Sequence, residues 1–494
     1  MMTAVGRAAM VMIAGAAVPV VLAGASGASA ATRTLAGPGT VALAGTWGTV
    51  QEVPGTATLN AGGSAQVNSV SCASAGNCTA GGFYKNSSLQ QQAFVVSKVN
   101  GTWHTAIQVP GTATLNKGGG AAVSSISCAS AGNCSAGGAY EDSSGRGQAF
   151  VVSEVNGTWH SAIQVPGTAV TSQIGSAGVL SVSCASAGNC SAGGFYGYVE
   201  NTVWRHYAFV VNEVNGTWHT AIQVPGLATL STGLDAQVSS VSCGSAGNCS
   251  ASGYYAQKSA ALQAFVVNEV NGSWHTAIEV PGTATLNKDG KAWATSVSCA
   301  SAGNCAAGGH YRDGSGHWQG FAASEVNGSW HTAIQVPGTA TLNKGGNAGV
   351  NSVSCASAGN CTAGGSYRDG ADHFQAFAAS QVNGTWHTAT QLPGTATLNK
   401  GGDTRVLSMS CASAGNCSAG GFYIDYYGHW QAFVASQVNG TWQTAIEVPG
   451  TATLNKGGYA QVNSVSCGAA GNCSAGGVYT DSSQRWQAFA VSES

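Results

Sequence analysis

One sequence unit occurs eight times, and this repetition constrains the fold more than any other feature of the chain. Pairs of cysteines and a Thr-Trp or Ser-Trp dipeptide return with a fixed period. Repeats of this length are typical of solenoids and propellers, in which each repeat is one supersecondary unit. The proline of a Pro-Gly turn marks the period, which is 56 residues with one interval of 59: Pro54, Pro110, Pro166, Pro225, Pro281, Pro337, Pro393 and Pro449.

Each unit contains four short runs of β-type sequence. In the first unit they span residues 65–72, 78–84, 92–99 and 102–109, and we term them strands a, b, c and d. Asn-Gly joins strands c and d, and this dipeptide is the strongest short signal for a hairpin because its turn needs two positive φ angles. Nothing in the unit has a helical period. The pattern predicts an all-β fold in which each unit is a four-stranded antiparallel propeller blade.

The two ends of the repeated region complement one another. The eighth unit stops after strand c at Ser494, whereas residues 46–54 form a strand d with no a, b or c before it. Pairing these ends closes a ring and removes two bare sheet edges. We therefore predict one eight-bladed propeller domain over residues 46–494, with its last blade completed by the N-terminal strand. Two domains of four units each are the alternative.

The unit resembles the Kelch-type propeller repeat, in which a Gly-Gly ends strand b and a Trp stands in strand d. Here Gly81-Gly82 precedes Trp103, and Gly193-Gly194 precedes Trp218. It is also similar to a broad group of secreted bacterial repeat proteins with an S-C-x5-C-x-A-x-G core and a terminal N-G-x-W. The likeness spans residues 46–494 and implies a propeller. The unit lacks the Kelch Tyr before the Trp and adds a cysteine pair, so Kelch functions are not transferred.

The sixteen cysteines occur only as eight pairs, one in each unit. The intervening residues supply no His, Asp or Glu, which disfavours a metal site, and we expect no metal or other cofactor. In an oxidising compartment pairing is the default, so we predict one disulfide in each a–b hairpin. The predicted pairs are Cys72–Cys78, Cys128–Cys134, Cys184–Cys190, Cys243–Cys249, Cys299–Cys305, Cys355–Cys361, Cys411–Cys417 and Cys467–Cys473.

The N-terminal segment has the features of a secretory signal peptide. A short head ending in Arg7 precedes an apolar run and the small residues Ala28-Ser29-Ala30, which predicts a signal peptide over residues 1–30 and a short linker over 31–45. A membrane anchor is the weaker alternative because Gly15 and Pro19 interrupt a short apolar run. We expect a secreted, extracellular protein with no membrane span after cleavage.

The charge composition disfavours nucleic acid as a partner. Only 7% of residues are charged, the formal net charge is −2, and the seventeen Lys and Arg residues are spread over the whole chain. A nucleic-acid binder needs a basic stripe that neutralises phosphates. The apolar fraction of 44% with thirteen Trp predicts a folded globular chain, and we expect a monomer.

Variation among the eight units collects in the b–c loops. The a–b and c–d turns, expected on one face of the disc, are nearly identical, whereas the b–c loops on the other face combine aromatic rings with Asp, Arg and His. Variable loops on a rigid scaffold are typical of ligand recognition. The candidate ligand-binding residues are Trp204, Arg205, His206, Arg312, Asp313, His317, Trp318, Arg368, Asp369, His373, Phe374, Asp425, Tyr427, His429, Trp430, Asp481, Arg485 and Trp486.

Three functions fit this pattern. The first is a binding module for carbohydrate or a cell-surface polymer, with several weak sites giving avidity. The second is a glycoside hydrolase or lyase, which needs two neighbouring carboxylates; Asp235 and Asp403, just before strand a, are isolated in the sequence, so no catalytic residue is assigned. The third is a structural propeller that presents its surface to protein partners and binds no small ligand.

Overall fold

The computed structural model describes residues 45–170, 175–200, 203–233, 235–259 and 261–494, without the side chains of residues 200, 203 and 204. The described residues all belong to one compact unit. The predicted signal peptide, residues 1–30, and residues 31–44 of the predicted linker lie outside the described residues.

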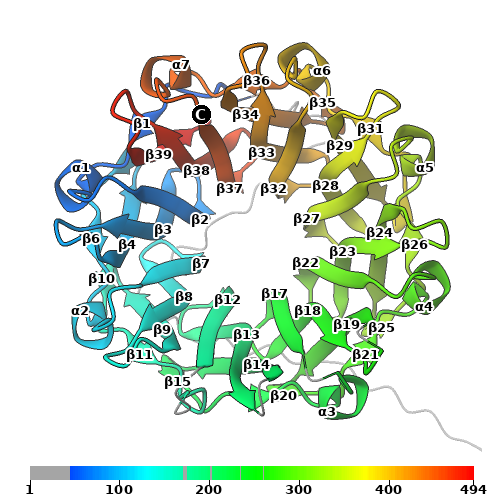
Figure 1. Ribbon diagram of the computed structural model, residues 1–494, viewed down its shortest axis with the longest axis horizontal. Helices are drawn as coiled ribbons and strands as arrows, with labels where there is room; N and C mark the ends of the chain where they lie inside the picture. The colour runs from blue at the N-terminus through cyan, green and yellow to red at the C-terminus, as the bar shows by residue number, and fades with distance from the viewer. Residues whose placement is uncertain (1–44, 171–174, 201–202, 234, 260) are drawn as a thin grey trace, which may run out of the picture. The chain divides into compact units, whose positions relative to one another are not determined.

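Eight antiparallel sheets form a closed ring of blades within this unit, which confirms the predicted eight-bladed propeller (Figure 1). Strand a is the innermost strand of every blade. In blades 1 to 8 it is β2 (Ala65–Ser74), β7 (Ala122–Ser130), β12 (Gly175–Ser186), β17 (Ala236–Ser245), β22 (Ala292–Ser301), β27 (Ala348–Ser357), β32 (Thr404–Ser413) and β37 (Ala460–Ala469).

Strands b and c complete the centre of each blade. Strand b is β3 (Asn77–Lys85), β8 (Asn133–Glu141), β13 (Asn189–Glu200), β18 (Asn248–Ala256), β23 (Asn304–Arg312), β28 (Asn360–Arg368), β33 (Asn416–Ile424) and β38 (Asn472–Thr480). Strand c is β4 (Gln91–Val99), β9 (Gly147–Val155), β14 (Val203–Val214), β19 (Leu262–Val270), β24 (Trp318–Val326), β29 (Phe374–Val382), β34 (Trp430–Val438) and β39 (Trp486–Ser492).

Strand d is interrupted, whereas the sequence predicted one continuous strand over 102–109. In blade 1 the backbone N–H of Ala106 leaves the blade and donates to the carbonyl of Pro54 in the preceding unit. The two pieces of strand d in blades 1 to 7 are β5 (Thr102–Trp103) and β6 (Ile107–Gln108), β10 (Thr158–Trp159) and β11 (Ile163–Gln164), β15 (Thr217–Trp218) and β16 (Ile222–Gln223), β20 (Ser273–Trp274) and β21 (Ile278–Glu279), β25 (Ser329–Trp330) and β26 (Ile334–Gln335), β30 (Thr385–Trp386) and β31 (Thr390–Gln391), and β35 (Thr441–Trp442) and β36 (Ile446–Glu447).

Short helices at the outer edge of the ring connect strand d to the next blade (Figure 1). The sequence shows no helical period because each helix is a single turn of four residues, too short to produce one. Each follows a glycine with positive φ, such as Gly55. The helices are α1 (Thr56–Leu59), α2 (Thr112–Leu115), α3 (Leu227–Leu230), α4 (Thr283–Leu286), α5 (Thr339–Leu342), α6 (Thr395–Leu398) and α7 (Thr451–Leu454).

The N-terminal strand closes the ring as predicted. Strand β1 (Gln51–Glu52) pairs antiparallel with β39, the last strand of the chain, and Trp47 forms a further bridge to Glu493. The resulting four-stranded sheet has the order β1-β39-β38-β37. Blade 8 is therefore built from both ends of the propeller, and both sheet edges at the closure are covered.

Hydrophobic cores lie between neighbouring blades. The core at the ring closure joins Trp103 of blade 1 to Ala488 and Ala490 of blade 8. The Gly-Gly in the middle of strand b permits this approach, because a Cβ on Gly81 would come within 2.5 Å of Ile126 in blade 2 and one on Gly82 within 1.9 Å of the Gln66 carbonyl. Any side chain at these two positions would force strands or blades apart.

Each cysteine pair forms a disulfide, as the sequence predicted. Cys72 and Cys78 are directly paired across strands a and b, and the other seven pairs are equivalent. The serines beside them join neighbouring blades, since Ser71 Oγ accepts a hydrogen bond from the Cys128 backbone. Eight disulfides indicate a protein that matures in an oxidising environment such as the cell exterior. None of the helices in the described ranges has the length and hydropathy of a membrane span.

Candidate functional site

The b–c loops, together with the connections that lead into strand a, form one face of the propeller, here called the b–c face. Each b–c loop packs on the next blade, since the Trp430 backbone N–H donates to the Gly458 carbonyl and Trp430 bridges to Tyr459. Equivalent bridges join Trp318 to Asn347 and Phe374 to Asp403. The predicted site residues therefore lie at successive junctions around the ring and do not converge on a single centre.

The loop aspartates hold their own loops in shape. Asp313 Oδ1 accepts hydrogen bonds from the backbone N–H groups of Ser315 and His317, and Oδ2 accepts one from Gln319 Nε2. Burial alone would raise the pKa of Asp313, but these hydrogen bonds outweigh it, and the pKa lies below the usual value. The same bonds and the same direction of the pKa hold for Asp142, Asp369, Asp425 and Asp481.

The arginines of this face differ in whether they are paired. Arg312 forms an ion pair with Asp289 at 2.9 Å, and Arg368 forms one with Asp372 at 2.7 Å. Arg485 is exposed and forms no ion pair with the described residues. Its guanidinium is therefore available to a ligand, whereas those of Arg312 and Arg368 must first give up a partner.

Aromatic side chains form a continuous stack of four rings at blades 7 and 8, whereas shorter contacts join Tyr196 to Tyr207 in blade 3 and Trp293 to Trp318 in blade 5. The rings of Phe422 and Trp430 stack at 4.0 Å, those of Trp430 and Tyr459 at 5.2 Å, and those of Tyr459 and Trp486 at 5.0 Å. Trp486 ends this stack with 37% of its surface exposed. We define the aromatic surface as Trp430, Tyr459 and Trp486 together with Tyr426 and Tyr427, which are 80% and 79% exposed on the neighbouring loop.

The predicted histidines and Phe374 lie outside the aromatic surface. His317, His373 and His429 are exposed, each beside a glycine of the next connection. Phe374 lies under the guanidinium of Arg405, 4.1 Å from its ring centre, and Arg405 in turn pairs with Asp403. These contacts indicate a structural role for Phe374 at the junction of blades 6 and 7.

The third unit is three residues longer than the others between strands b and c, where the sequence predicts a longer b–c loop, but the structure has longer strands there. The three additional residues lengthen the strands, so that β13 and β14 are twelve residues each. Trp204, Arg205 and His206 belong to β14, opposite Val199, Tyr198 and Gly197. His206 Nδ1 lies 3.1 Å from Asp235 Oδ1. Each strand is three residues longer than its nine-residue counterpart in blade 1, and the antiparallel pairing continues in register to Glu200 and Val203, so the insertion extends the strand pairing.

The opposite face, formed by the a–b and c–d turns, carries grooves between neighbouring blades and is here called the groove face. The groove between blades 1 and 2 has a volume of about 450 Å³, that between blades 6 and 7 about 270 Å³, and those between blades 4 and 5 and between blades 3 and 4 about 230 and 220 Å³. The near-identical turn sequences gave no sign of these differences.

A buried polar side chain from strand c crosses each blade interface. In blade 4 this interface residue is Glu269, which accepts hydrogen bonds from Ser191 and Asn212 of blade 3. In blade 1 it is Lys98, which donates to Ser474 and Ser492 of blade 8. Sequence reasoning missed this ring because the residues alternate with apolar ones as ordinary strand residues do. The full set is Lys98, Glu154, Glu213, Glu269, Glu325, Gln381, Gln437 and Glu493.

Burial changes the ionisation of several interface residues. Burial raises the pKa of Glu154, Glu269 and Glu325 above the usual value, and the hydrogen bonds that they accept offset only part of this effect. The pKa of Glu493 is raised for the same reason. No cluster of three or more His, Cys, Asp or Glu residues suited to a metal occurs in the described part of the chain.

Comparisons with known proteins give distant structural likenesses. No protein-family model matches the chain, and no curated protein matches its sequence, so the Kelch resemblance rests on the sequence motifs alone. The PL25 ulvan lyase, a polysaccharide lyase, has a TM-score of 0.39 at 8% identity over 90% of this chain and 94% of its own. The Hadza microbial sialidase Hz136 has a TM-score of 0.37 at 11% identity over 70% and 73%. Because the TM-scores and sequence identities are this low, these likenesses indicate nothing about the activity of the chain.

Proposed function

We propose that this protein is a secreted propeller that binds carbohydrate or another extracellular polymer through its b–c face, at the aromatic surface of blades 7 and 8. The observation that carries the proposal is the run of stacked rings that ends in the exposed Trp486 of blade 8, together with the highly exposed Tyr426 and Tyr427 in the b–c loop of blade 7. The unpaired Arg485 adjoins Trp486 in the chain and adds a charged donor.

Rings of this kind suit sugar recognition. The apolar faces of sugar rings stack on aromatic side chains, while neighbouring donors and acceptors fix the hydroxyl groups. Trp430 and Tyr459 brace Trp486 from behind, so little conformational entropy is lost when a ligand binds. Exposed rings on neighbouring blades would let a polymer make several weak contacts at once, which raises its overall affinity.

We assign no acid–base role to the loop carboxylates. Both oxygens of Asp425 and Asp481 accept hydrogen bonds from their own loops, and their lowered pKa values keep them ionised rather than able to donate a proton. The hydrolase or lyase alternative therefore has no supporting observation at these residues, and binding is the function that the geometry favours.

The proposal is tested by retention on insoluble cell-wall polysaccharides and by a glycan array. We expect the wild-type protein to be retained, and the double substitution of Trp486→Ala and Tyr427→Ala to weaken binding by more than about tenfold. Leu89→Ala is the matched control, because Leu89 is an exposed side chain in the b–c loop of blade 1. Absence of wild-type retention on every glycan, or retention that survives the double substitution, would overturn the proposal and favour a protein partner.

A further inference from the structure

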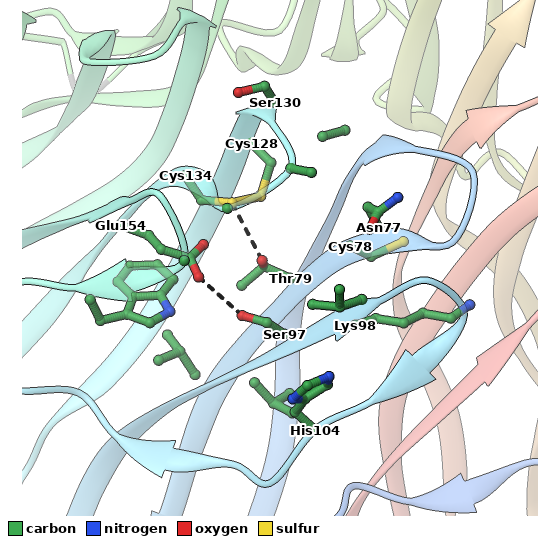
Figure 2. Close-up of a pocket in the computed structure, with 18 of the residues that line it drawn as sticks. Asn77, Cys78, Thr79, Ser97, Lys98, His104, Cys128, Ser130, Cys134 and Glu154 are labelled. Carbon is green, nitrogen blue, oxygen red and sulfur yellow. Dashed lines mark hydrogen bonds between the residues drawn. A yellow bond between two sulfur atoms is a disulfide. The ribbon is translucent and has the colours of Figure 1, made fainter.

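The interface between blades 1 and 2 differs from its neighbours at one hydroxyl group. In four interfaces the glutamate accepts a hydrogen bond from the serine that follows the second cysteine of the preceding blade: Ser135, Ser191, Ser250 and Ser418. Blade 1 has Thr79 at this position. Its Oγ1 lies 3.4 Å from Cys134 Sγ (Figure 2), a contact with the next blade that the serines make as well, but it forms no hydrogen bond with Glu154. Glu154 therefore loses one of the two donors that its counterparts have.

This change leaves a buried carboxylate oxygen without a partner. Glu154 Oε1 accepts a hydrogen bond from Ser97 Oγ at 3.2 Å, as Figure 2 shows, but Oε2 has no partner among the described residues. Glu154 is only 4% exposed, so water does not freely replace the missing donor. An unpaired buried polar atom is destabilising, and more so when it is charged.

A second interface repeats the same change and has the same result. Thr362 in blade 6 also lies 3.4 Å from the cysteine of the next blade, Cys417, and behind it the Oε1 atom of Gln437 is buried with no partner in the described structure. The two threonines thus coincide with two unpaired oxygens, and their two grooves are the largest of those described. The branched Cβ of threonine restricts its hydroxyl, and neither threonine forms a hydrogen bond with the polar side chain that crosses its interface.

The groove between blades 1 and 2 contains an unpaired donor as well. The indole N–H groups of Trp218, Trp274 and Trp330 donate to a strand c side chain of the preceding blade. Trp159 Nε1 is buried and has no acceptor within the described residues. Glu154 and Trp159 both line this groove, which therefore presents one unpaired acceptor and one unpaired donor.

A ligand hydroxyl group would satisfy both Glu154 Oε2 and Trp159 Nε1, because it donates one hydrogen bond while accepting another. An ammonium group only donates, and a carboxylate only accepts. The remaining wall includes the exposed aliphatic side chains of Val99 and Ile107, which suit the C–H groups of a small polyol. A volume of about 450 Å³ is within the usual range for small-molecule sites.

We propose that the groove between blades 1 and 2 binds a small polyhydroxylated molecule, a monosaccharide or polyol, one hydroxyl of which donates to Glu154 Oε2 and accepts from Trp159 Nε1. Oε2 of Glu154 has no contact with bulk solvent. The carboxylate therefore rotates about its terminal side-chain torsion angle, whose energy profile is broad, so that Oε2 contacts the ligand. This site lies on the groove face and does not depend on the polymer-binding proposal for the b–c face.

Thr79→Ser is the most direct test, because it restores the serine of the other interfaces. The full protein is titrated with D-glucose, N-acetyl-D-glucosamine, D-mannitol and n-butylamine by saturation-transfer NMR and calorimetry. We expect a sugar or polyol to bind, Thr79→Ser to weaken that binding by at least about tenfold, and the free Thr79→Ser protein to melt at a higher temperature than the wild type. Trp159→Phe should also weaken binding, whereas Thr362→Ser and Trp486→Ala should not.

Several outcomes would overturn the proposed site between blades 1 and 2. Failure of all three hydroxylated probes to bind, binding that Thr79→Ser leaves unchanged, or binding of n-butylamine alone would each overturn the assignment. A crystal structure soaked in the best probe that shows only an ordered water between Glu154 and Trp159 would also overturn it. Because Trp486→Ala leaves this groove intact, loss of polymer binding and loss of small-sugar binding are measured separately.

Discussion

The interface between blades 1 and 2 and the interface between blades 3 and 4 are built from the same strands and the same kind of buried glutamate. Glu269 accepts hydrogen bonds from Ser191 and Asn212, whereas Glu154 accepts only one, from Ser97. The interface between blades 3 and 4 is therefore satisfied within the protein, whereas the interface between blades 1 and 2 has an unpaired oxygen beside a groove of about twice the volume. In a repeat protein, one methyl group is enough to turn a structural contact into a candidate ligand site.

The largest effect that separates the two interfaces is expected from removing the carboxylates. Glu269→Ala leaves two buried donors, on Ser191 and Asn212, without an acceptor, and should lower the free energy of unfolding by about 3 kcal/mol. Glu154→Ala frees only Ser97 and relieves an unpaired charge, so it should cost about 1 kcal/mol or less. Urea unfolding with the disulfides intact measures both; equal losses would contradict the comparison.

A somewhat smaller effect is expected at the b–c face, where the polar groups are satisfied. Asp313→Ala removes the acceptor for two backbone N–H groups and for Gln319, which should cost about 2 kcal/mol. Asp289→Ala is the control, since its exposed pair with Arg312 should contribute at most about 1 kcal/mol. Similar unfolding free energies for these two variants would mean that the aspartate does not organise the loop.

The dependence of stability on pH should show both kinds of carboxylate. The folded state raises the pKa of Glu154, Glu269 and Glu325 above 4.5, so it binds protons more tightly than the unfolded chain, and stability should rise as pH falls from neutral toward about 4.5. The folded state lowers the pKa of loop aspartates such as Asp313 below 3.8, so stability should fall as the pH drops below 3.8 and through the folded-state value.

Thermal melts at pH 7, 5 and 3 test this dependence. Glu269→Gln should reduce the gain between pH 7 and 5, because Gln381 and Gln437 already show that an amide is accepted at this position. If the wild-type protein instead loses stability steadily from pH 7 to 5, the folded state does not raise the pKa of the interface glutamates, and the prediction is wrong.

The smallest effect is expected at the lysines of the helical turns. Lys117 Nζ donates to the carbonyl of Ala113 in its own turn and is exposed. Lys117→Ala should change the free energy of unfolding by no more than about 0.5 kcal/mol. A loss above about 1 kcal/mol in urea unfolding would indicate that these lysines support the blade connections.

The sequence predicts the ring, the blade order, the disulfides and the closure, because each follows from a period or from a local signal such as Asn-Gly. It predicts the interrupted strand d and the one-turn helices poorly, since the Ala106 contact to Pro54 is a backbone hydrogen bond between units, which no particular side chain marks in the sequence. Variation among the units predicts a ligand site in the b–c loops. In the structure, however, Asp313 and Arg312 already have partners within the protein.

On the groove face, by contrast, the sequence varies little although the polar contacts differ between interfaces. Its turns are nearly constant, and the informative differences are single residues read against the other units: Thr79 in place of a serine, and Lys98 in place of a glutamate. Their meaning depends on which atoms meet across a blade interface, which only the arrangement of neighbouring blades provides. Comparing equivalent positions of the eight units could have found these residues, but it could not have shown that Glu154 lacks a donor.

The most direct test of this account is the pKa of Glu154, measured from the side-chain carboxyl carbon by NMR titration and compared with that of Glu269. Because Glu154 has one hydrogen-bond donor and Glu269 has two, Glu154 should titrate at the higher pH, and Thr79→Ser should lower its pKa toward that of Glu269. A pKa of Glu154 equal to or below that of Glu269, and unmoved by Thr79→Ser, would contradict the account.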